Sequence, residues 1–287
     1  MSENQNPSSC NGSCSSCGTS GCGSRTEREE ASTARAHVAH VVGVVSGKGG
    51  VGKSLVTCLL ASALNKRGYK VGILDADVTG PSIPKAFGLH GRLMGDKDGI
   101  IPFATESGIE VVSTNLMLDE EDAPVAWRGP VVTGLLKQFF GQTNWEEIDY
   151  LLVDMPPGTS DIFLTVMQSM NLDGIVTVSA PQELVAMIVG KAVNLANTMN
   201  VPVLGLVENM AYFKCDECGK KHYIFGNPQG AEVAKRYGIP AHAELPLDQS
   251  FASLVDAGKI EDYDVEGALD VVIDQILAIP AKKDAAE

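Results

Sequence analysis

The stretch SGKGGVGKS, residues 46–54, lies between a short apolar run and a segment whose apolar residues recur at helical spacing. It contains the pattern G-x-x-x-x-G-K-[ST], with Gly47, Gly52, Lys53 and Ser54 at the fixed positions. This pattern predicts a loop whose backbone N–H groups surround phosphate, with the lysine on the outer phosphates and the serine hydroxyl on Mg²⁺. The flanking strand and helix favour a true phosphate loop over a chance match.

Apolar strands alternate with amphipathic helices along the rest of the chain. The run HVVGVVSG before the loop is β-branched and continuous, as in a strand that is buried on both faces of a parallel sheet. The predicted strands are 38–46, 70–77, 109–114, 149–156, 174–181 and 201–209, and the predicted helices are 54–68, 131–140, 162–170, 185–199, 229–237 and 265–278. The alternation predicts an α/β fold, a doubly wound and mostly parallel sheet with helices on both faces.

The chain divides into a tail and one domain. Residues 1–36 are rich in Ser, Gly and Cys and lack large aliphatic residues, so we expect this tail to be disordered without a ligand. Residues 37–287 show no internal repeat and no linker, and they are expected to form a single nucleotide-binding domain with a C-x-x-C insertion at 215–218.

Composition excludes some partners. The formal charge of −14 and the pI near 4.8 argue against sequence-independent binding to nucleic acid or to an anionic membrane, since both need clustered Lys and Arg. The sequence has no run of about 18 apolar residues and no basic stretch followed by an apolar one at its start. We therefore expect a cytoplasmic protein.

Three acidic residues at the ends of two predicted strands point to hydrolysis chemistry. Asp154 ends the strand in DYLLVDMP, which is the position of the carboxylate that orients magnesium in phosphate-loop enzymes. Asp75 and Asp77 end the strand in ILDAD, and Asp77 is a candidate for positioning or activating the attacking water. The carboxyl ends of parallel strands meet at one edge, so these groups should converge. Asp77 as a simple helix cap or turn residue stays open.

The seven cysteines are odd in number and clustered, which fits a secreted disulfide framework poorly. Cys215 and Cys218 form a C-x-x-C pair that can direct two thiolates at one metal, and soft sulfur selects iron-sulfur clusters, zinc or copper(I). With His222 nearby, zinc and a cluster are equally compatible with the residues alone, and a redox dithiol is a third alternative. Cys58, on the predicted helix 54–68, is expected to be a buried small hydrophobe.

The second lysine of the loop, Lys48 in GKGGVGKS, makes the chain resemble the deviant Walker A group of dimeric ATPases. That group includes partition and division-site ATPases, the nitrogenase iron protein and iron-sulfur carriers. Within it, the chain is similar over residues 38–277 to the Mrp/ApbC family of iron-sulfur cluster carrier ATPases. The similarity rests on GKGGVGKS, LDADVTGPSIP, WRGP, DMPPGTSD, SAPQE, ENMAYFKCDEC and ELPLDQS.

The resemblance implies roles for particular residues. Lys48 would reach across a homodimer to the partner's phosphates, and Asp77 would lie in the first switch. Gly158 and Asp161 would lie in the second switch, and Asn209 would contact adenine. The candidate catalytic residues are Lys48, Lys53 and Asp77. The candidate nucleotide-binding residues are Gly47, Lys48, Gly49, Gly50, Val51, Gly52, Lys53, Ser54, Asp154, Gly158 and Asn209.

The resemblance also assigns the thiols. Cys215 and Cys218 match the family's paired ligands, one pair per subunit, which bridge a [4Fe-4S] cluster across the dimer. The implied cofactors are ATP, Mg²⁺ and the [4Fe-4S] cluster, and the implied partners are apo iron-sulfur proteins that accept the cluster.

Four tail cysteines form a further candidate cluster site, since four thiolates in one small loop suffice for a [4Fe-4S] cluster. Some scaffold-type members of the family carry such a site, but with a longer gap after the first cysteine. Thiols without a ligand role in a disordered segment are the alternative. These cysteines are Cys10, Cys14, Cys17 and Cys22.

Two other functional classes compete with an ATP-hydrolysing cluster carrier. A positioning ATPase with a structural zinc at the C-x-x-C pair would need a basic surface or a basic C-terminal helix, but the C-terminal segment is acidic and contains Pro280. An electron-transfer reductase like the nitrogenase iron protein has bridging ligands that are well separated along the chain. The adjacent pair Cys215 and Cys218 argues against that class.

Overall fold

The computed structural model describes residues 38–77, 80, 82–97, 99–117, 129–158, 161–181 and 185–281. The four tail cysteines, the side chain of Asp161 and most of the WRGP motif lie outside the described residues.

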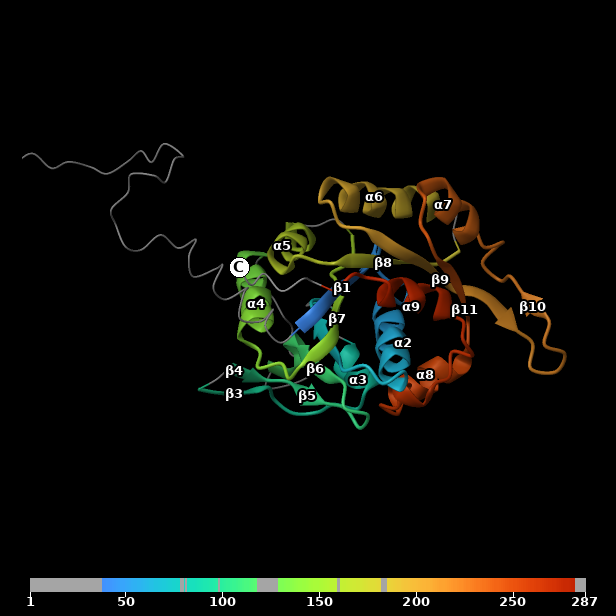
Figure 1. Cartoon of the computed structure of the whole chain (residues 1–287). Coiled ribbons are helices and arrows are strands. Elements are labelled where there is room, and N and C mark those ends of the chain that lie inside the picture. The colour runs from blue at the N-terminus through green and yellow to red at the C-terminus, as the bar shows by residue number, and fades with distance from the viewer. Residues whose placement is uncertain are drawn as a thin grey trace, which may run out of the picture.

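Nine strands of the described ranges form one sheet in the order β10-β9-β8-β1-β7-β2-β6-β5, with β11 paired to β9 (Figure 1). The pairs among β9, β8, β1, β7, β2 and β6 are parallel, as is the pair of β11 with β9, whereas β5 and β10 at the two ends run antiparallel. The strands are β1 (Val38–Ser46), β2 (Val71–Asp75), β5 (Phe103–Ala104), β6 (Glu110–Ser113), β7 (Ile148–Asp154), β8 (Gly174–Ser179), β9 (Val203–Lys214), β10 (Lys221–His222) and β11 (His242–Pro246). The predicted mostly parallel α/β sheet is confirmed.

The strand sequences follow from their position between two layers of helices. All residues of β2 and β8 are buried, and β1 is buried except at one position near its start. Strands covered on both faces have no solvent side, so they read as continuous β-branched runs rather than as alternating ones.

Helices cover both faces of the sheet (Figure 1). On one face, α2 (Lys53–Lys66), α3 (Ile83–Ala86), α8 (Gln249–Asp256) and α9 (Asp270–Leu277) contribute to one hydrophobic cluster. On the other lie α4 (Gly129–Gln142), α5 (Asp161–Met170), α6 (Val185–Thr198) and α7 (Gly230–Tyr237), with two further clusters. The remaining elements are the hairpin of β3 (Met94–Asp96) with β4 (Gly99–Ile101) and the 3₁₀ helices η1 (Thr114–Met117) and η2 (Ile260–Asp262). None of the described helices has the length and apolar character that crossing a bilayer requires.

Two predicted elements have clearly different bounds in the structure. Strand β9 was expected to end at residue 209 but continues to Lys214, because β11 pairs with it as far as Tyr212 and β10 pairs with Phe213 and Lys214. The last helix was expected from residue 265 but begins at Asp270, after a turn in which the Ala268 N–H donates to the Val265 carbonyl. The sequence prediction also contained none of the short elements α3, α8, β3, β4, β5, β10 and β11.

The aromatic side chain of Phe139, on α4, contributes to the hydrophobic core. Phe139 is fully buried in the cluster beneath α4 and α5, whereas Val131 on the same helix is 59% exposed. We expect Phe139→Ala to lower the free energy of unfolding by about 3–5 kcal/mol, because it removes buried apolar surface and leaves a cavity. Val131→Ala is the matched control and should change it by less than about 0.5 kcal/mol. Urea denaturation followed by circular dichroism measures both, and equal losses would contradict the described packing.

Candidate functional site

The phosphate loop joins the carboxyl end of β1 to the start of α2, beside the ends of β7 and β8. Its backbone requires glycine: Gly50 and Gly52 have φ of +79° and +80°. A Cβ on Gly52 would also lie 2.2 Å from Asn209 Nδ2. A side chain at this position therefore conflicts with both the backbone angle and the neighbouring strand.

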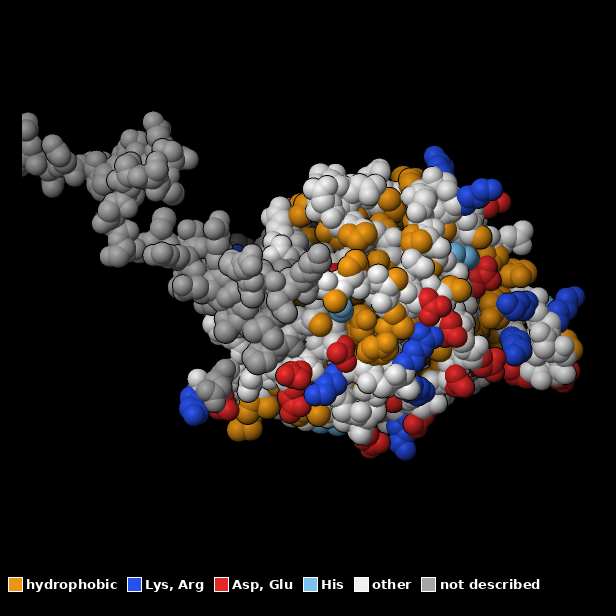
Figure 2. All heavy atoms as spheres, viewed as in Figure 1, with side chains coloured by type: hydrophobic (Ala, Val, Ile, Leu, Met, Phe, Trp, Pro, Cys, Tyr) orange, Lys and Arg blue, Asp and Glu red, His pale blue; other side chains and the backbone are white. Residues whose placement is uncertain are grey.

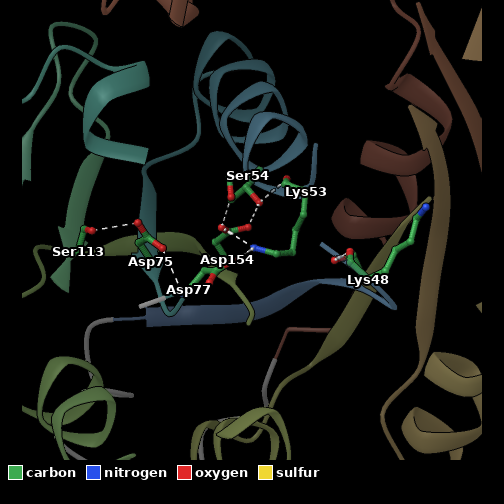
Figure 3. Close-up of polar contacts among 9 residues, drawn as sticks. Lys48, Lys53, Ser54, Asp75, Asp77, Ser113 and Asp154 are labelled. Atoms are coloured by element: carbon green, nitrogen blue, oxygen red, sulfur yellow. Dashed lines mark hydrogen bonds and ion pairs between the residues drawn. The ribbon is translucent and has the colours of Figure 1, made fainter. Parts of the chain in front are cut away.

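One carboxylate lies at the centre of the site (Figure 3). Asp154 Oδ2 accepts hydrogen bonds from Lys53 Nζ at 2.7 Å and Ser54 Oγ at 2.6 Å, and Asp154 Oδ1 accepts one from Thr57 Oγ1 at 2.7 Å. Asp154 is fully buried and Lys53 is 5% exposed. A buried carboxylate is tolerated only when it is paired and hydrogen-bonded, and three donors from one helical turn of α2 satisfy this one.

The same lysine contacts the second acidic group that the sequence singled out. Lys53 Nζ lies 3.4 Å from Asp77 Oδ2, so the ammonium stands between two carboxylates. The structure thus brings together Lys53, Ser54, Asp77 and Asp154, as the convergence of strand ends predicts. Hydroxyl and carboxylate oxygens are the ligands that Mg²⁺ prefers, and the ammonium is suited to phosphate, so the donor set fits a magnesium-bound nucleotide.

A third carboxyl lies behind this group. Asp75 is fully buried at the end of β2, where its Oδ2 accepts a hydrogen bond from Ser113 Oγ at 2.9 Å and its Oδ1 accepts one from the Asp77 N–H at 3.2 Å. Burial, and next the negative charge of Asp154, raise the pKa of Asp75 to about 8. Sequence reasoning missed both Thr57 and Ser113, since neither belongs to a motif and each acts through a partner far away in the chain.

A cavity of about 310 Å³ opens over the loop, and its walls include Gly50, Lys53, Asp77 and Pro157. This volume lies at the lower end of the range for small-molecule sites. Cys58 also borders it and is fully buried, as predicted, and burial raises the pKa of its thiol.

Two loop positions are tied to neighbouring elements. The Gly158 N–H donates to the Ser46 carbonyl at 2.8 Å, which joins the segment after β7 to the last residue of β1. Lys48 extends away from Lys53 and Asp154 in Figure 3, and its carbonyl accepts a hydrogen bond from Ser46 Oγ at 2.9 Å. The two lysines of the loop therefore point in different directions.

Asn209 supports the loop from β9. Its side chain is 1% exposed, and Nδ2 donates to the Val51 carbonyl at 3.0 Å. The buried Oδ1 has no hydrogen-bond partner among the described residues. The contact with the loop is thus direct, and the contact of Asn209 with adenine stays a prediction.

The C-x-x-C pair lies in a tight turn at the tip of the β9–β10 hairpin, which projects from the body in Figure 1. The Cys215 N–H donates to the Lys220 carbonyl at 3.0 Å, and the Gly219 N–H donates to the Cys215 carbonyl at 2.8 Å. The backbone N–H groups of Cys218 and Glu217, and then the Cys218 thiol, donate to the Cys215 sulfur and lower its pKa. The turn thus brings the two sulfurs together and favours the thiolate that a soft metal needs.

Histidine 222 does not belong to this turn. It lies in β10, where it pairs with Phe213. The turn itself therefore supplies two sulfur ligands.

A second group of possible metal ligands lies on the α7 side of the sheet, where Glu208, His242 and Glu244 place ligand atoms within 4.8 Å of one another. Glu208 is fully buried, and its two oxygens accept the N–H groups of Gln229 at 3.2 Å and Gly230 at 2.7 Å. This carboxylate therefore stabilises the first turn of α7, which accounts for its burial without a metal.

Comparisons with known proteins identify the family and the fold of the chain. The family model for NUBPL iron-transfer P-loop NTPases, of the ParA group, matches residues 37–278. The iron-sulfur cluster carrier protein of Clostridium perfringens is 52% identical over 232 residues, covering 78% of this chain and 81% of that protein. The carrier of Saccharolobus solfataricus is 45% identical over 216 residues, covering 75% and 73%.

Among solved structures, a nucleotide-binding protein from Archaeoglobus fulgidus in complex with ADP is 41% identical. It covers 88% of this chain and 97% of its own, with a TM-score of 0.76. The cell division ATPase MinD of Pyrococcus furiosus has a TM-score of 0.57 at 20% identity and covers 84% of this chain and 100% of its own, so it shares the fold.

The loop geometry gives a direct test of the nucleotide site. We expect Gly52→Ala to weaken ATP binding at least about tenfold, because the new methyl group clashes with Asn209 and the residue must keep a positive φ. Gly134→Ala is the control, since Gly134 lies in α4 and a Cβ there meets no atom within 4 Å. Titration with a fluorescent ATP analogue measures both affinities. Parental affinity in Gly52→Ala would contradict the described loop.

Proposed function

Because the chain belongs to the family of NUBPL iron-transfer P-loop NTPases, we propose that it is an ATP-binding and ATP-hydrolysing carrier that delivers a [4Fe-4S] cluster to apoproteins. The observation that carries the cluster half is the turn at the end of β9. There, Cys215 and Cys218 stand three positions apart in one tight turn, and interactions with the backbone N–H groups of Cys218 and Glu217, and with the Cys218 thiol, lower the pKa of Cys215 and so favour its thiolate. The observation that supports ATP binding is the phosphate loop, in which Lys53 and Ser54 are both hydrogen-bonded to Asp154.

In the proposed hydrolysis, the residues of the loop exchange partners when nucleotide binds. Lys53 leaves the carboxylates of Asp154 and Asp77 and turns to the outer phosphates, while backbone N–H groups of the loop and of the first turn of α2 face the phosphate oxygens. Ser54 Oγ and the Asp154 carboxylate would hold Mg²⁺, which would supply positive charge beside the phosphates. Asp77, released from Lys53, orients the attacking water.

The proposed cluster site is completed by a second copy of the chain. Two thiolates cannot complete the coordination of a [4Fe-4S] cluster, which takes four cysteine ligands. A twofold interface places each surface against its own copy, so a homodimer brings two such turns together. The direction of Lys48, away from the phosphate site of its own chain, supports the same dimer, in which this lysine reaches the partner's nucleotide.

We further propose that slow hydrolysis is coupled to cluster transfer through β9. This strand carries Asn209, which holds the loop at Val51, and then leads to Cys215. Between them Met210 has a φ of +57°, a conformation that non-glycine residues rarely adopt. A change in the loop that moves Asn209 would thus reach the thiol turn along one strand.

The domain division belongs to the same proposal. Residues 37–287 form the ATPase domain, and the tail, residues 1–36, carries the second candidate cluster site. The ligands of that second site would be Cys10, Cys14, Cys17 and Cys22.

Cluster transfer is the most direct test. After anaerobic reconstitution, the parent should contain iron, show a thiolate-to-iron absorption band and activate an apo iron-sulfur protein. We expect Cys215→Ala/Cys218→Ala to lose most transfer, whereas Cys58→Ala should keep it, because Cys58 is buried in α2. Unchanged transfer in the double variant would contradict the assignment, as would stoichiometric zinc without iron in the parent.

Mixed dimers test whether the site is shared. Equal amounts of parent and double-variant subunits, allowed to exchange, give about one quarter of dimers with four thiolates at the bridge. A bridging cluster at this site should therefore retain about one quarter of the iron that an all-parent dimer holds there. Retention of about one half would mean that each subunit binds metal on its own. Analysis is best done in a background with the four tail cysteines changed to serine, so that only the bridge contributes iron.

A further inference from the structure

We propose that Asp75 and Ser113 form a buried positioning pair that holds the backbone of Asp77 in place for ATP hydrolysis. This inference rests on the ATPase activity proposed above. It concerns two residues that do not reach the nucleotide and belong to no phosphate-binding motif. Asp75 acts on Asp77, and Ser113 acts on Asp75.

Strand pairing places Asp75 beside both Ser113 and Asp154. Asp75 ends β2 and lies in register with Ser113 of β6 on one side and with Asp154 of β7 on the other. Figure 3 shows these side chains in a row along the carboxyl edge of the sheet. Asp75, Ser113 and Asp154 are all fully buried. The row is therefore fixed by the sheet rather than by a surface loop.

The contact with Asp77 lies just beyond the end of the strand. The Asp77 N–H donates to Asp75 Oδ1 at 3.2 Å, and the Asp77 carboxylate stands 3.4 Å from Lys53 Nζ. Strand β2 ends at Asp75, so Asp77 has no strand partner of its own. The hydrogen bond to the Asp75 carboxyl instead fixes the backbone of Asp77, the residue that is proposed to orient water. Ser113 fixes the carboxyl in turn, and its Oγ also accepts the Asn115 N–H at 3.3 Å.

The experiment is steady-state ATP hydrolysis by the full chain with Mg²⁺ at pH 7. Asp75→Ala should lower kcat at least about tenfold with KM for ATP changed less than about threefold, because the loss falls on the reacting geometry. Asp75→Asn should restore at least about one third of the parental kcat, since its amide oxygen accepts from the Asp77 N–H and its NH₂ donates to Ser113.

Ser113 provides a second, milder arm. We expect Ser113→Ala to lower kcat about threefold and Ser113→Thr to restore it, since threonine keeps the hydroxyl. Asp173→Ala is the matched control. Asp173 Oδ2 also accepts a backbone N–H, from Val41 at 2.9 Å, but Asp173 lies just before β8 begins, at the amino end of that strand and away from the nucleotide site. Asp173→Ala should lower the melting temperature but leave kcat at pH 7 near the parental value.

Two results would overturn the inference: a parental kcat in Asp75→Ala, or an equal loss of kcat in Asp75→Asn and Asp75→Ala. If Asp75→Ala does not fold, the Ser113 pair decides, and equal kcat in Ser113→Ala and the parent overturns it. A parent that hydrolyses no ATP contradicts the proposed function itself. An active parent with a fully active Asp75→Ala contradicts only the role of Asp75.

Discussion

The buried carboxylate of Asp154 joins the phosphate loop to the centre of the sheet. It stands at the end of β7, next to β1, and receives hydrogen bonds from three side chains at the start of α2. Removing one partner of a buried ion pair costs about 3–5 kcal/mol, because the other charge stays buried and uncompensated. The orientation of α2, and with it the direction of the loop's N–H groups, therefore depends on this one side chain.

The same contact explains how the site stays formed before a nucleotide arrives. Lys53 is held near its working position by Asp154 and Asp77, so little side-chain entropy remains to be lost when phosphate takes their place. Phosphate must compete with these two carboxylates for the Lys53 ammonium.

The sequence predicted those parts of the molecule that local patterns determine. Six of the parallel strands were recognisable as apolar runs, because burial on both faces leaves no polar alternation. The loop residues and Asp154 were predicted because the motif fixes their spacing, and the geometry brings them together. The extension of β9 to Lys214 was not predicted, because it depends on pairing with β10 and β11, which follow later in the chain.

Side chains that act through distant partners were also missed. Thr57 looks like any polar residue of α2, and only its hydrogen bond to Asp154, 97 positions later, gives it a role. Ser113 is a common residue at the end of a strand until β2 places Asp75 beside it. The pairing of strands, and not any motif, creates these contacts. Sequence periodicity does not encode which strand ends become neighbours.

The distance along the chain between Lys53 and Asp154, 101 residues, has a consequence for synthesis on the ribosome. The loop and α2 leave the ribosome first, but the carboxylate that holds them follows only after a third of the protein has been added. Asn209, which supports the loop at Val51, follows 158 residues after its partner. Contacts so distant in sequence form late and slow the folding of parallel sheets. A growing chain that is still short of β9 therefore lacks the support that Asn209 gives to the loop, so the nucleotide site is complete only when the cysteine turn is about to emerge.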